Sequence, residues 1–224
     1  MSSSEPLDIK NYIGLTSDTP IRFIASDVDG TLVNDAKSVD PEVVSAVRAA
    51  RESGIRVAIA SGRAWHEMDD VIDAMPCLRY FVCTNGAYVM DKEGKKELVH
   101  ISFDKTRAID LVRKLMTYGV FVEAYVKAEI FGQYPTVGNE TLQAERFFRP
   151  NIRPFILKTR TMVPDLLAHL ESLPEGPEKI QIFYGDERIR ERILADYAMT
   201  FRGQPQMVRG ANVFTTFLNQ AKEI

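Results

Sequence analysis

The chain has 224 residues, 45% of them hydrophobic and 26% charged, and carries a formal net charge of -3 at pH 7. This length and apolar content allow one large domain or two small ones. The slight acidity argues against a nucleic acid or a membrane surface as the main partner, and no stretch approaches the length of a membrane span. Residues 1–19 lack the pattern of a secretory signal, so we expect a mobile tail and a cytoplasmic protein.

Residues 20–86 alternate predicted strands with predicted helices. The apolar runs "IRFIAS", "IRVAIAS" and "YFVCTNG" predict three strands, and the segments after the first two predict helices. Asp40 suits the N-cap of the first helix and Gly54 suits its end. Because the strands are apolar almost throughout, the pattern predicts an α/β fold with a Rossmann-like parallel sheet.

The alternation changes after Gly86, and residues 87–212 predict a mixed α+β unit. A hairpin around Lys92–Gly94 opens this unit in our interpretation, and a helix ending at Gly119 follows it. The chain then predicts a strand-like stretch, an irregular segment from Pro135 to Pro154, and a helix–strand–helix succession. We expect residues 213–224 to form the last strand of this unit and to begin a return to the first one.

Each predicted strand of the first unit ends in polar, glycine-bearing residues: "SDVDGT", "SGR" and "TNG". The carboxyl ends of parallel strands meet at one edge of a sheet, which is where ligands bind in such folds. Glycines let the backbone turn there and direct amides at an anion, and the start of the helix after Ser61 would do the same. The sequence therefore predicts a phosphate site made from Asp27, Asp29, Thr31, Ser61, Arg63 and Asn85, with Gly30, Gly62 and Gly86.

Two other interpretations of "DVDG" are weaker. A calcium loop with Gly30 at position six would have Ala25 at position one and Ala36 at position twelve, and neither side chain can bind a cation. Asp27 and Asp29 could instead only cap a turn. That interpretation leaves the polar ends of the other two strands unexplained.

The motif "DVDGTL" after an apolar strand, followed by "SGR" and "TNGA" after the next two, resembles the haloacid dehalogenase superfamily. The match is to its Cof-type phosphatases, which carry a type-two cap inserted after the third strand. The resemblance runs from about Ile21 onward, and it implies that residues 20–86 are the core and residues 87–212 the inserted α+β cap.

The resemblance implies a role for each motif residue. Asp27 would be the nucleophile that forms an aspartyl-phosphate, and Asp29 the general acid and base. Asp27 and the backbone carbonyl of Asp29 would bind Mg²⁺. The implied phosphate-binding residues are Gly30, Thr31, Ser61, Gly62 and Lys222, and the implied substrate-binding residues are Arg63, Asn85 and Gly86. Arg63 could instead form only a surface ion pair.

Two motifs that the family carries after the cap are incomplete here. Lys222 lies near the place of the phosphate-stabilising lysine, but its spacing is poor and Glu223 follows it where a glycine is usual. The second acidic motif of the magnesium site is absent, because no acid follows Asp186 at the required spacing. Lys179 precedes a cap strand and is not the catalytic lysine in this interpretation. Without the strands that follow the cap, "IRFIA" would become an apolar sheet edge.

The sequence thus predicts a magnesium-dependent phosphatase that hydrolyses small phosphorylated metabolites, such as sugar phosphates, through an aspartyl-phosphate. The alternative is a truncated or impaired homologue that binds ligand without efficient turnover. A phosphate-accepting receiver domain also places aspartates at strand ends, but the large α+β unit argues against it. We expect a small phosphate ester as the ligand, and neither nucleic acid nor membrane.

Overall fold

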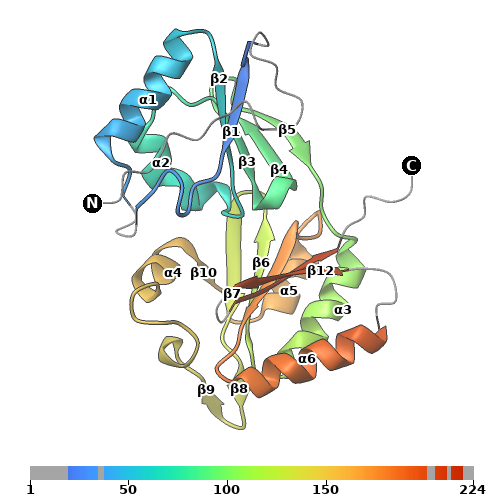
Figure 1. Ribbon diagram of the computed structural model, residues 1–224. Helices are drawn as coiled ribbons and strands as arrows, with labels where there is room; N and C mark the ends of the chain where they lie inside the picture. The colour runs from blue at the N-terminus through green and yellow to red at the C-terminus, as the bar shows by residue number, and fades with distance from the viewer. Residues whose placement is uncertain (1–19, 35–37, 201–204, 211–212, 219–224) are drawn as a thin grey trace.

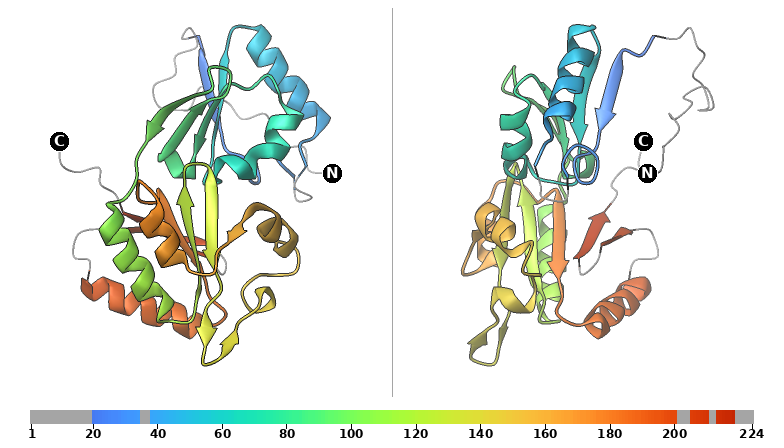
Figure 2. Two further views of the ribbon diagram at one scale, coloured as in Figure 1. Left: turned by 180° about the vertical axis from the view of Figure 1, so that it is seen from behind. Right: turned by 60° about the vertical axis from the view of Figure 1, so that its left-hand side comes forward.

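The computed structural model describes residues 20–34, 38–200, 205–210 and 213–218, which form two units, each built on its own sheet (Figure 1). We call residues 20–100 the five-stranded unit and residues 105–218 the six-stranded unit. Figure 1 shows the first above the second, and the side view in Figure 2 shows the same arrangement. The chain passes from one unit to the other through residues 101–104.

The sheet of the five-stranded unit confirms the predicted parallel α/β arrangement. Its strands lie in the spatial order β1 (Phe23–Ser26), β2 (Arg56–Ala60), β3 (Tyr80–Cys83), β4 (Tyr88–Asp91) and β5 (Lys96–His100). β1, β2 and β3 are parallel, with Ala25 opposite Ala58 and Ile59 opposite Phe81. The carboxyl ends of these three strands therefore point the same way, toward the six-stranded unit (Figure 1).

Two helices and a 3₁₀ turn cover this sheet. α1 spans Pro41–Glu52, and the turn Trp65–Met68 leads directly into α2 (Asp69–Ala74). Fully buried Met68, Val71 and Met75 pack with Ile59 and Phe81 of the sheet, and each such side chain contributes about 1.5–3 kcal/mol when fully buried. The predicted second helix is thus a turn followed by a six-residue helix.

Asp40 stands at the N-cap of α1, but its side chain makes no cap hydrogen bond. Its Oδ1 instead accepts a hydrogen bond of 2.9 Å from Asn34 Nδ2. Pro41 at the first helical position fits there, because it has no N–H to satisfy. Gly54 has φ +83°, a left-handed conformation that suits the residue after a helix end.

The hairpin around Lys92–Gly94 lies in a different unit from the one that we expected. We placed it at the start of the α+β unit, but β4 pairs antiparallel with β3, with Val82 opposite Val89. The hairpin therefore extends the five-stranded sheet. Its alternating pattern predicted two paired strands correctly, but such a pattern does not say to which sheet the strands add.

The six-stranded unit has the spatial strand order β10-β7-β6-β11-β13-β12. These strands are β6 (Phe121–Val126), β7 (Glu129–Gln133), β10 (Thr161–Met162), β11 (Lys179–Phe183), β12 (Pro205–Gly210) and β13 (Val213–Leu218). β12 is absent from our sequence interpretation, since Pro205 and Gly210 at its ends are typical of loops. Its partner β13 is the strand that we predicted from "VFTTFLN".

Helices complete the six-stranded unit: α3 (Lys105–Met116), α4 (Arg153–Thr159), α5 (Leu166–Ser172) and α6 (Glu187–Thr200). α3 and α5 pack with the sheet around buried Val112, Leu166 and Ile180. A short ribbon of β8 (Thr136–Val137) and β9 (Glu140–Thr141) and a turn at Ala144–Arg146 lie in the segment that we expected to be irregular.

β1 lies at the edge of its sheet and pairs with β2 alone among the described strands. Ile21, Phe23 and Ile24 are exposed there, and Phe23 retains 54% of its accessible surface. This matches the apolar edge that the sequence predicts for "IRFIA". None of the helices in the described ranges is long and apolar enough to cross a membrane.

The two units also meet beside the linking segment. His100 at the end of β5 lies between two glutamates of the six-stranded unit, with Nε2 2.7 Å from Glu178 Oε1 and Nδ1 2.9 Å from Glu175 Oε2. Lys127 forms a further ion pair with Glu175 at 2.8 Å. The His100 contacts join the two units near residues 101–104, and the Lys127–Glu175 pair holds one of the two glutamates in place.

Candidate active site

A cleft of about 490 Å³ lies at the carboxyl ends of β1, β2 and β3, facing the six-stranded unit. Six of the predicted site residues line it: Asp27, Asp29, Ser61, Gly62, Arg63 and Asn85. Gly30 and Gly86 each follow a lining residue, and Thr31 follows Gly30, but none of the three is in the wall of the cleft. Lys222 lies outside the described residues.

The two aspartates are presented by a tight turn that follows β1. Val28, between them, is fully buried, and its carbonyl oxygen accepts hydrogen bonds from the amides of Thr31, Leu32 and Val33. Burial of Val28 leaves Asp27 and Asp29 on the exposed side of the chain, where both carboxylates reach the cleft. The order Asp27, Val28, Asp29 in the sequence therefore places two exposed carboxylates on either side of a buried valine.

Arg63 holds Asp29 through two parallel hydrogen bonds. Arg63 Nε lies 2.9 Å from Asp29 Oδ2, and Nη2 lies 2.9 Å from Oδ1, a bidentate geometry that is among the strongest for a carboxylate. Asp70 binds Arg63 Nη1 at 3.2 Å. Burial lowers the pKa of Arg63, but the bonds and charges of Asp29 and Asp70 outweigh it, and the net pKa is raised. Such a pair stabilises the charged form of a carboxylate.

This placement changes our interpretation of Arg63. We expected it to face substrate or to form a surface ion pair. It lines the cleft, but only 8% of its surface is exposed, so its ion pairs are not on the surface, and it connects Asp29 to the start of α2. Its direct partner is the acid itself.

The segment Ser61–Arg63 after β2 is fixed by the turn after β3. The amide of Asn85 donates to Ser61 O at 3.0 Å, and the amide of Thr84 donates to Arg63 O at 2.8 Å. Thr84 and Asn85 have φ +49° and +57°, a left-handed conformation that is uncommon for residues other than glycine and often marks functional turns. The second and third strand ends therefore form one hydrogen-bonded unit.

The far wall of the cleft comes from the six-stranded unit, and sequence reasoning missed it. Tyr125, Phe155, Arg160, Lys179 and Gln181 contribute to this wall. The Phe155 ring centroid lies 5.4 Å from the Arg63 guanidinium carbon and 5.7 Å from that of Arg160. The sequence does hold one indication of this wall. In "EKIQIFYG", Lys179 directly precedes an apolar run, and a lysine at the start of a buried strand is uncommon unless it has a partner.

A buried ion cluster joins this wall to the five-stranded unit. Arg160 binds Glu67 of the five-stranded unit at 2.5 Å and Glu123 of β6 at 2.8 Å, and all three side chains are at most 5% exposed. Burial raises the pKa of Glu123, although the charge of Arg160 opposes this. Glu67 also accepts the amide of Ala64 at 2.8 Å.

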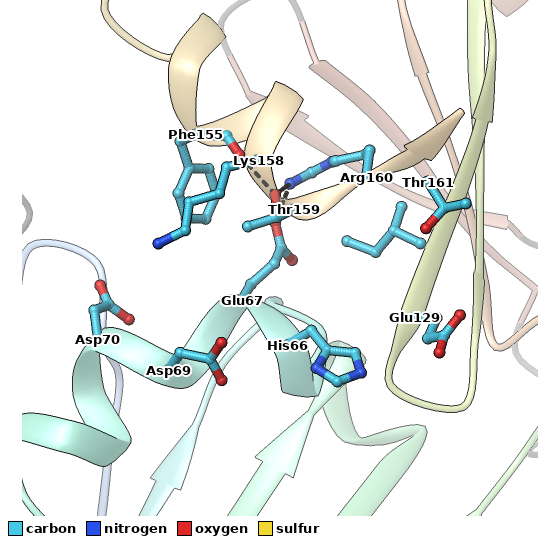
Figure 3. Close-up of a pocket in the computed structure, with 11 residues that line it drawn as sticks. His66, Glu67, Asp69, Asp70, Glu129, Phe155, Lys158, Thr159, Arg160 and Thr161 are labelled. Atoms are coloured by element: carbon cyan, nitrogen blue, oxygen red, sulfur yellow. Dashed lines mark hydrogen bonds and ion pairs between the residues drawn. The ribbon is translucent and has the colours of Figure 1, made fainter.

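A second pocket of about 460 Å³ lies on the other side of this cluster (Figure 3). Figure 3 shows His66, Glu67, Asp69 and Asp70 on the segment below it, and Phe155 to Thr161 above it. Glu67, Phe155 and Arg160 line both hollows. The Glu67–Arg160 pair is thus a partition between the cleft with the two aspartates and the outer pocket.

The oxygen atoms at the cleft meet part of the requirement for binding a hard cation. The Asp27 carboxylate and the Asp29 carbonyl are oxygen ligands of the type that Mg²⁺ prefers, and Mg²⁺ commonly takes only one or two carboxylates from the protein. Among the described residues, no group of three or more acidic, histidine or cysteine side chains could hold a metal. The Asp27 carboxylate and the Asp29 carbonyl could therefore supply part of the oxygen ligands of such a cation.

The comparisons with known proteins agree with this geometry. The family model for haloacid dehalogenase-like hydrolases matches residues 24–203. The chain belongs to this family. The resemblance that the three strand ends imply is thus confirmed.

Curated relatives in this family are phosphatases. The chain is 31% identical over 125 residues to phosphatase YwpJ of Bacillus subtilis, covering 56% of this chain and 43% of YwpJ. It is 29% identical over 115 residues to pyridoxal phosphate phosphatase YbhA of Escherichia coli, covering 51% and 42%. It is 30% identical over 207 residues to the putative phosphatase YxeH of B. subtilis, covering 88% and 70%. The chain thus spans less than half of the first two relatives.

Solved structures share the fold. A haloacid dehalogenase-like hydrolase from Bacteroides thetaiotaomicron matches with a TM-score of 0.72 at 19% identity, over 90% of this chain and 72% of that one. One from B. subtilis matches with a TM-score of 0.70 at 21% identity, over 88% and 73%. Both likenesses extend over the two sheets described above.

Proposed function

We propose that this chain is a magnesium-dependent phosphatase of small phosphorylated metabolites that works through an aspartyl-phosphate. The observation that supports this most is the convergence of Asp27, Asp29 and Ser61 on one cleft at the carboxyl ends of parallel strands. We further propose that the five-stranded unit belongs to the catalytic core and that the six-stranded unit is the inserted cap.

In the first half of the proposed reaction, an Asp27 carboxylate oxygen attacks phosphorus. The bond between phosphorus and the ester oxygen breaks, and Asp29 gives that oxygen a proton. For this step Asp29 has to be protonated and released from Arg63. The Ser61 hydroxyl and nearby amides would hold the phosphoryl oxygens while charge redistributes.

In the second half, water attacks the phosphorus of the aspartyl-phosphate. Asp29 takes a proton from this water, inorganic phosphate leaves, and Asp27 is regenerated. The arrangement seen here, with Asp29 held by Arg63, suits its role as a base. Mg²⁺ at Asp27 and the Asp29 carbonyl would offset the repulsion between a carboxylate and a phosphate dianion.

The leaving group would lie against the six-stranded unit. That wall combines aromatic side chains with polar ones, namely Phe155 and Tyr125 beside Lys179 and Gln181. Relatives with assigned substrates act on pyridoxal phosphate and on 5-amino-6-(5-phospho-D-ribitylamino)uracil. These names support a phosphorylated small metabolite as the substrate of this chain.

One observation favours a second function, ligand binding without efficient turnover. Within the described ranges the acids that complete the magnesium site are not found. A site with two ligand oxygens and several donors would still bind phosphate.

Hydrolysis of 4-nitrophenyl phosphate with and without Mg²⁺ tests the proposal. We expect Mg²⁺-dependent release of nitrophenol by a form extended so that both family motifs are complete, slower release by the 224-residue chain, and phosphate binding by both. Turnover by the 224-residue chain at the rate of the extended form would show that the absent acids are not needed. If neither form hydrolysed the ester or bound phosphate, the proposed function would be wrong.

Asp29→Asn should lower kcat about 10²–10⁴-fold, because an amide can neither give nor take a proton. We expect a larger loss with an alkyl phosphate than with 4-nitrophenyl phosphate, whose leaving group departs without a proton. Mg²⁺ binding, followed by calorimetry, should change less than threefold, because the backbone carbonyl remains. An equal loss with both esters would contradict the acid role.

A further inference from the structure

Three consecutive backbone carbonyl groups at the cleft accept hydrogen bonds, and their donors come from both units. Ser61 O and Arg63 O accept hydrogen bonds from the amides of Asn85 and Thr84, which belong to the five-stranded unit. The carbonyl between them, Gly62 O, accepts a hydrogen bond of 3.0 Å from Lys179 Nζ of the six-stranded unit. The five-stranded unit thus fixes both sides of this segment, and the other unit fixes its centre.

The Gly62 carbonyl is linked to the Ser61 side chain through a rigid group. A peptide bond is planar, so the direction of Gly62 C=O also sets the direction of the Arg63 N–H. That N–H donates to Ser61 Oγ at 3.2 Å. Since Oγ accepts this bond, the hydroxyl proton of Ser61 remains to be donated elsewhere.

Lys179 is itself held in place. It is 5% exposed, its Nζ lies 4.1 Å from the centroid of the Tyr125 ring, and the two residues are opposite each other in the register of β11 and β6. Burial lowers the pKa of Lys179 to about 8, although Glu67 and Glu123 oppose this shift. Because its side chain is packed on all sides, Lys179 loses little further conformational entropy when it binds Gly62 O.

We propose that Lys179 is a positioning residue of the phosphate site. It donates a hydrogen bond to Gly62 O and so orients the Gly62–Arg63 peptide. The Arg63 N–H of this peptide then directs the Ser61 hydroxyl proton toward a bound phosphoryl group. Because Lys179 belongs to the other unit, the hydroxyl is oriented only while the two units are together. The phosphate-binding part of this inference rests on the proposed function, but the link from Lys179 to the Arg63 amide does not.

Hydrogen exchange of the Arg63 amide, measured by NMR at pH 7, tests that link without turnover. Lys179→Met removes the donor, and loss of a hydrogen bond from a charged group should lower the protection of this amide about tenfold or more. Lys158→Met is the matched control, because Lys158 is an exposed lysine of the same unit. Unchanged protection in Lys179→Met, or an equal loss in the control, would overturn the proposal.

Calorimetric binding of inorganic phosphate in the presence of Mg²⁺ tests the effect on Ser61. We expect Lys179→Met and Ser61→Ala each to weaken binding about tenfold, and the double variant to bind no more than twofold more weakly than Ser61→Ala. Fully additive losses would show that Lys179 does not act through Ser61. If the parent protein bound no phosphate, the proposed function would fail, and the amide measurement alone would decide whether Lys179 positions the segment.

Two further variants guard against misfolding. Lys179→Gln keeps a polar side chain beside Glu67 and Glu123 but is one atom shorter than lysine, so it should show the same loss of Arg63 protection. Lys179→Arg keeps a charged donor and should retain protection within about threefold of the parent. Loss of protection in Lys179→Arg equal to that in Lys179→Gln, with thermal unfolding unchanged in both, would contradict the proposal.

Discussion

Asp27→Asn is expected to abolish turnover of 4-nitrophenyl phosphate, with a loss of at least about 10³-fold, because the amide cannot attack phosphorus. It should also prevent the complex with beryllofluoride and Mg²⁺, which mimics a phosphoryl group on a carboxylate. Asp27 is exposed, so the free energy of unfolding should change by no more than about 0.5 kcal/mol. Loss of activity would therefore come from the chemistry and not from unfolding.

Asp73→Asn is the control for this experiment. It makes the same change of charge at an exposed position of α2, and it should leave both turnover and the beryllofluoride complex unchanged. Retention of the complex or of more than a tenth of the activity in Asp27→Asn would show that another group is the nucleophile.

Arg160→Met is expected to destabilise the protein by about 3–5 kcal/mol, because it leaves buried carboxylates without their cation. Glu123 is fully buried and Glu67 is 5% exposed, so water cannot replace the guanidinium. Urea unfolding at pH 7 measures the change. Arg113→Met removes an ion pair of exposed side chains on α3 and should cost no more than about 1 kcal/mol.

The loss in Arg160→Met should depend on pH. Burial already holds the pKa of Glu123 above its ordinary value of 4.5, and removal of the Arg160 charge raises it further. The folded state then binds more protons than the unfolded state above about pH 4.5, so the free energy of unfolding falls more steeply with rising pH than in the parent. Adding Glu123→Gln should recover part of the loss at pH 7. No recovery would mean that Glu123 is not the source of the cost.

The parts of the site that could be predicted are those that one sheet dictates. Asp27, Ser61 and Asn85 each follow an apolar strand, and parallel strands necessarily bring such residues together. The link between Arg63 and Asp29 joins residues 34 positions apart, and no local pattern indicates it. Lys179 and Gly62 are 117 positions apart, and Arg160 and Glu67 are 93 apart, so these contacts depend on how the two units sit together.

For the fold as well, the sequence predicted the elements better than their partners. Periodicity identified the hairpin at Lys92–Gly94 but could not assign it to a sheet, because β-pairing is a contact between distant segments. Asp40 has the residue type of an N-cap, yet its carboxylate binds Asn34 instead, since a nearby donor competes with the helix amides. The residue types at a strand end can be read from a short segment of sequence, whereas the strand or side chain that pairs with it cannot.

The position of β1 links the shape of the sheet to the mobility of Asp27, the proposed nucleophile. Along one side of this strand the N–H and C=O groups that point away from β2 have no neighbouring described strand. Such a side accepts an added strand, by the same backbone pairing through which extended peptides bind to sheet edges. A strand that paired there would also clamp the residues directly before Asp27. Pairing of such a strand with β1 would therefore complete the sheet and restrain Asp27 at the same time.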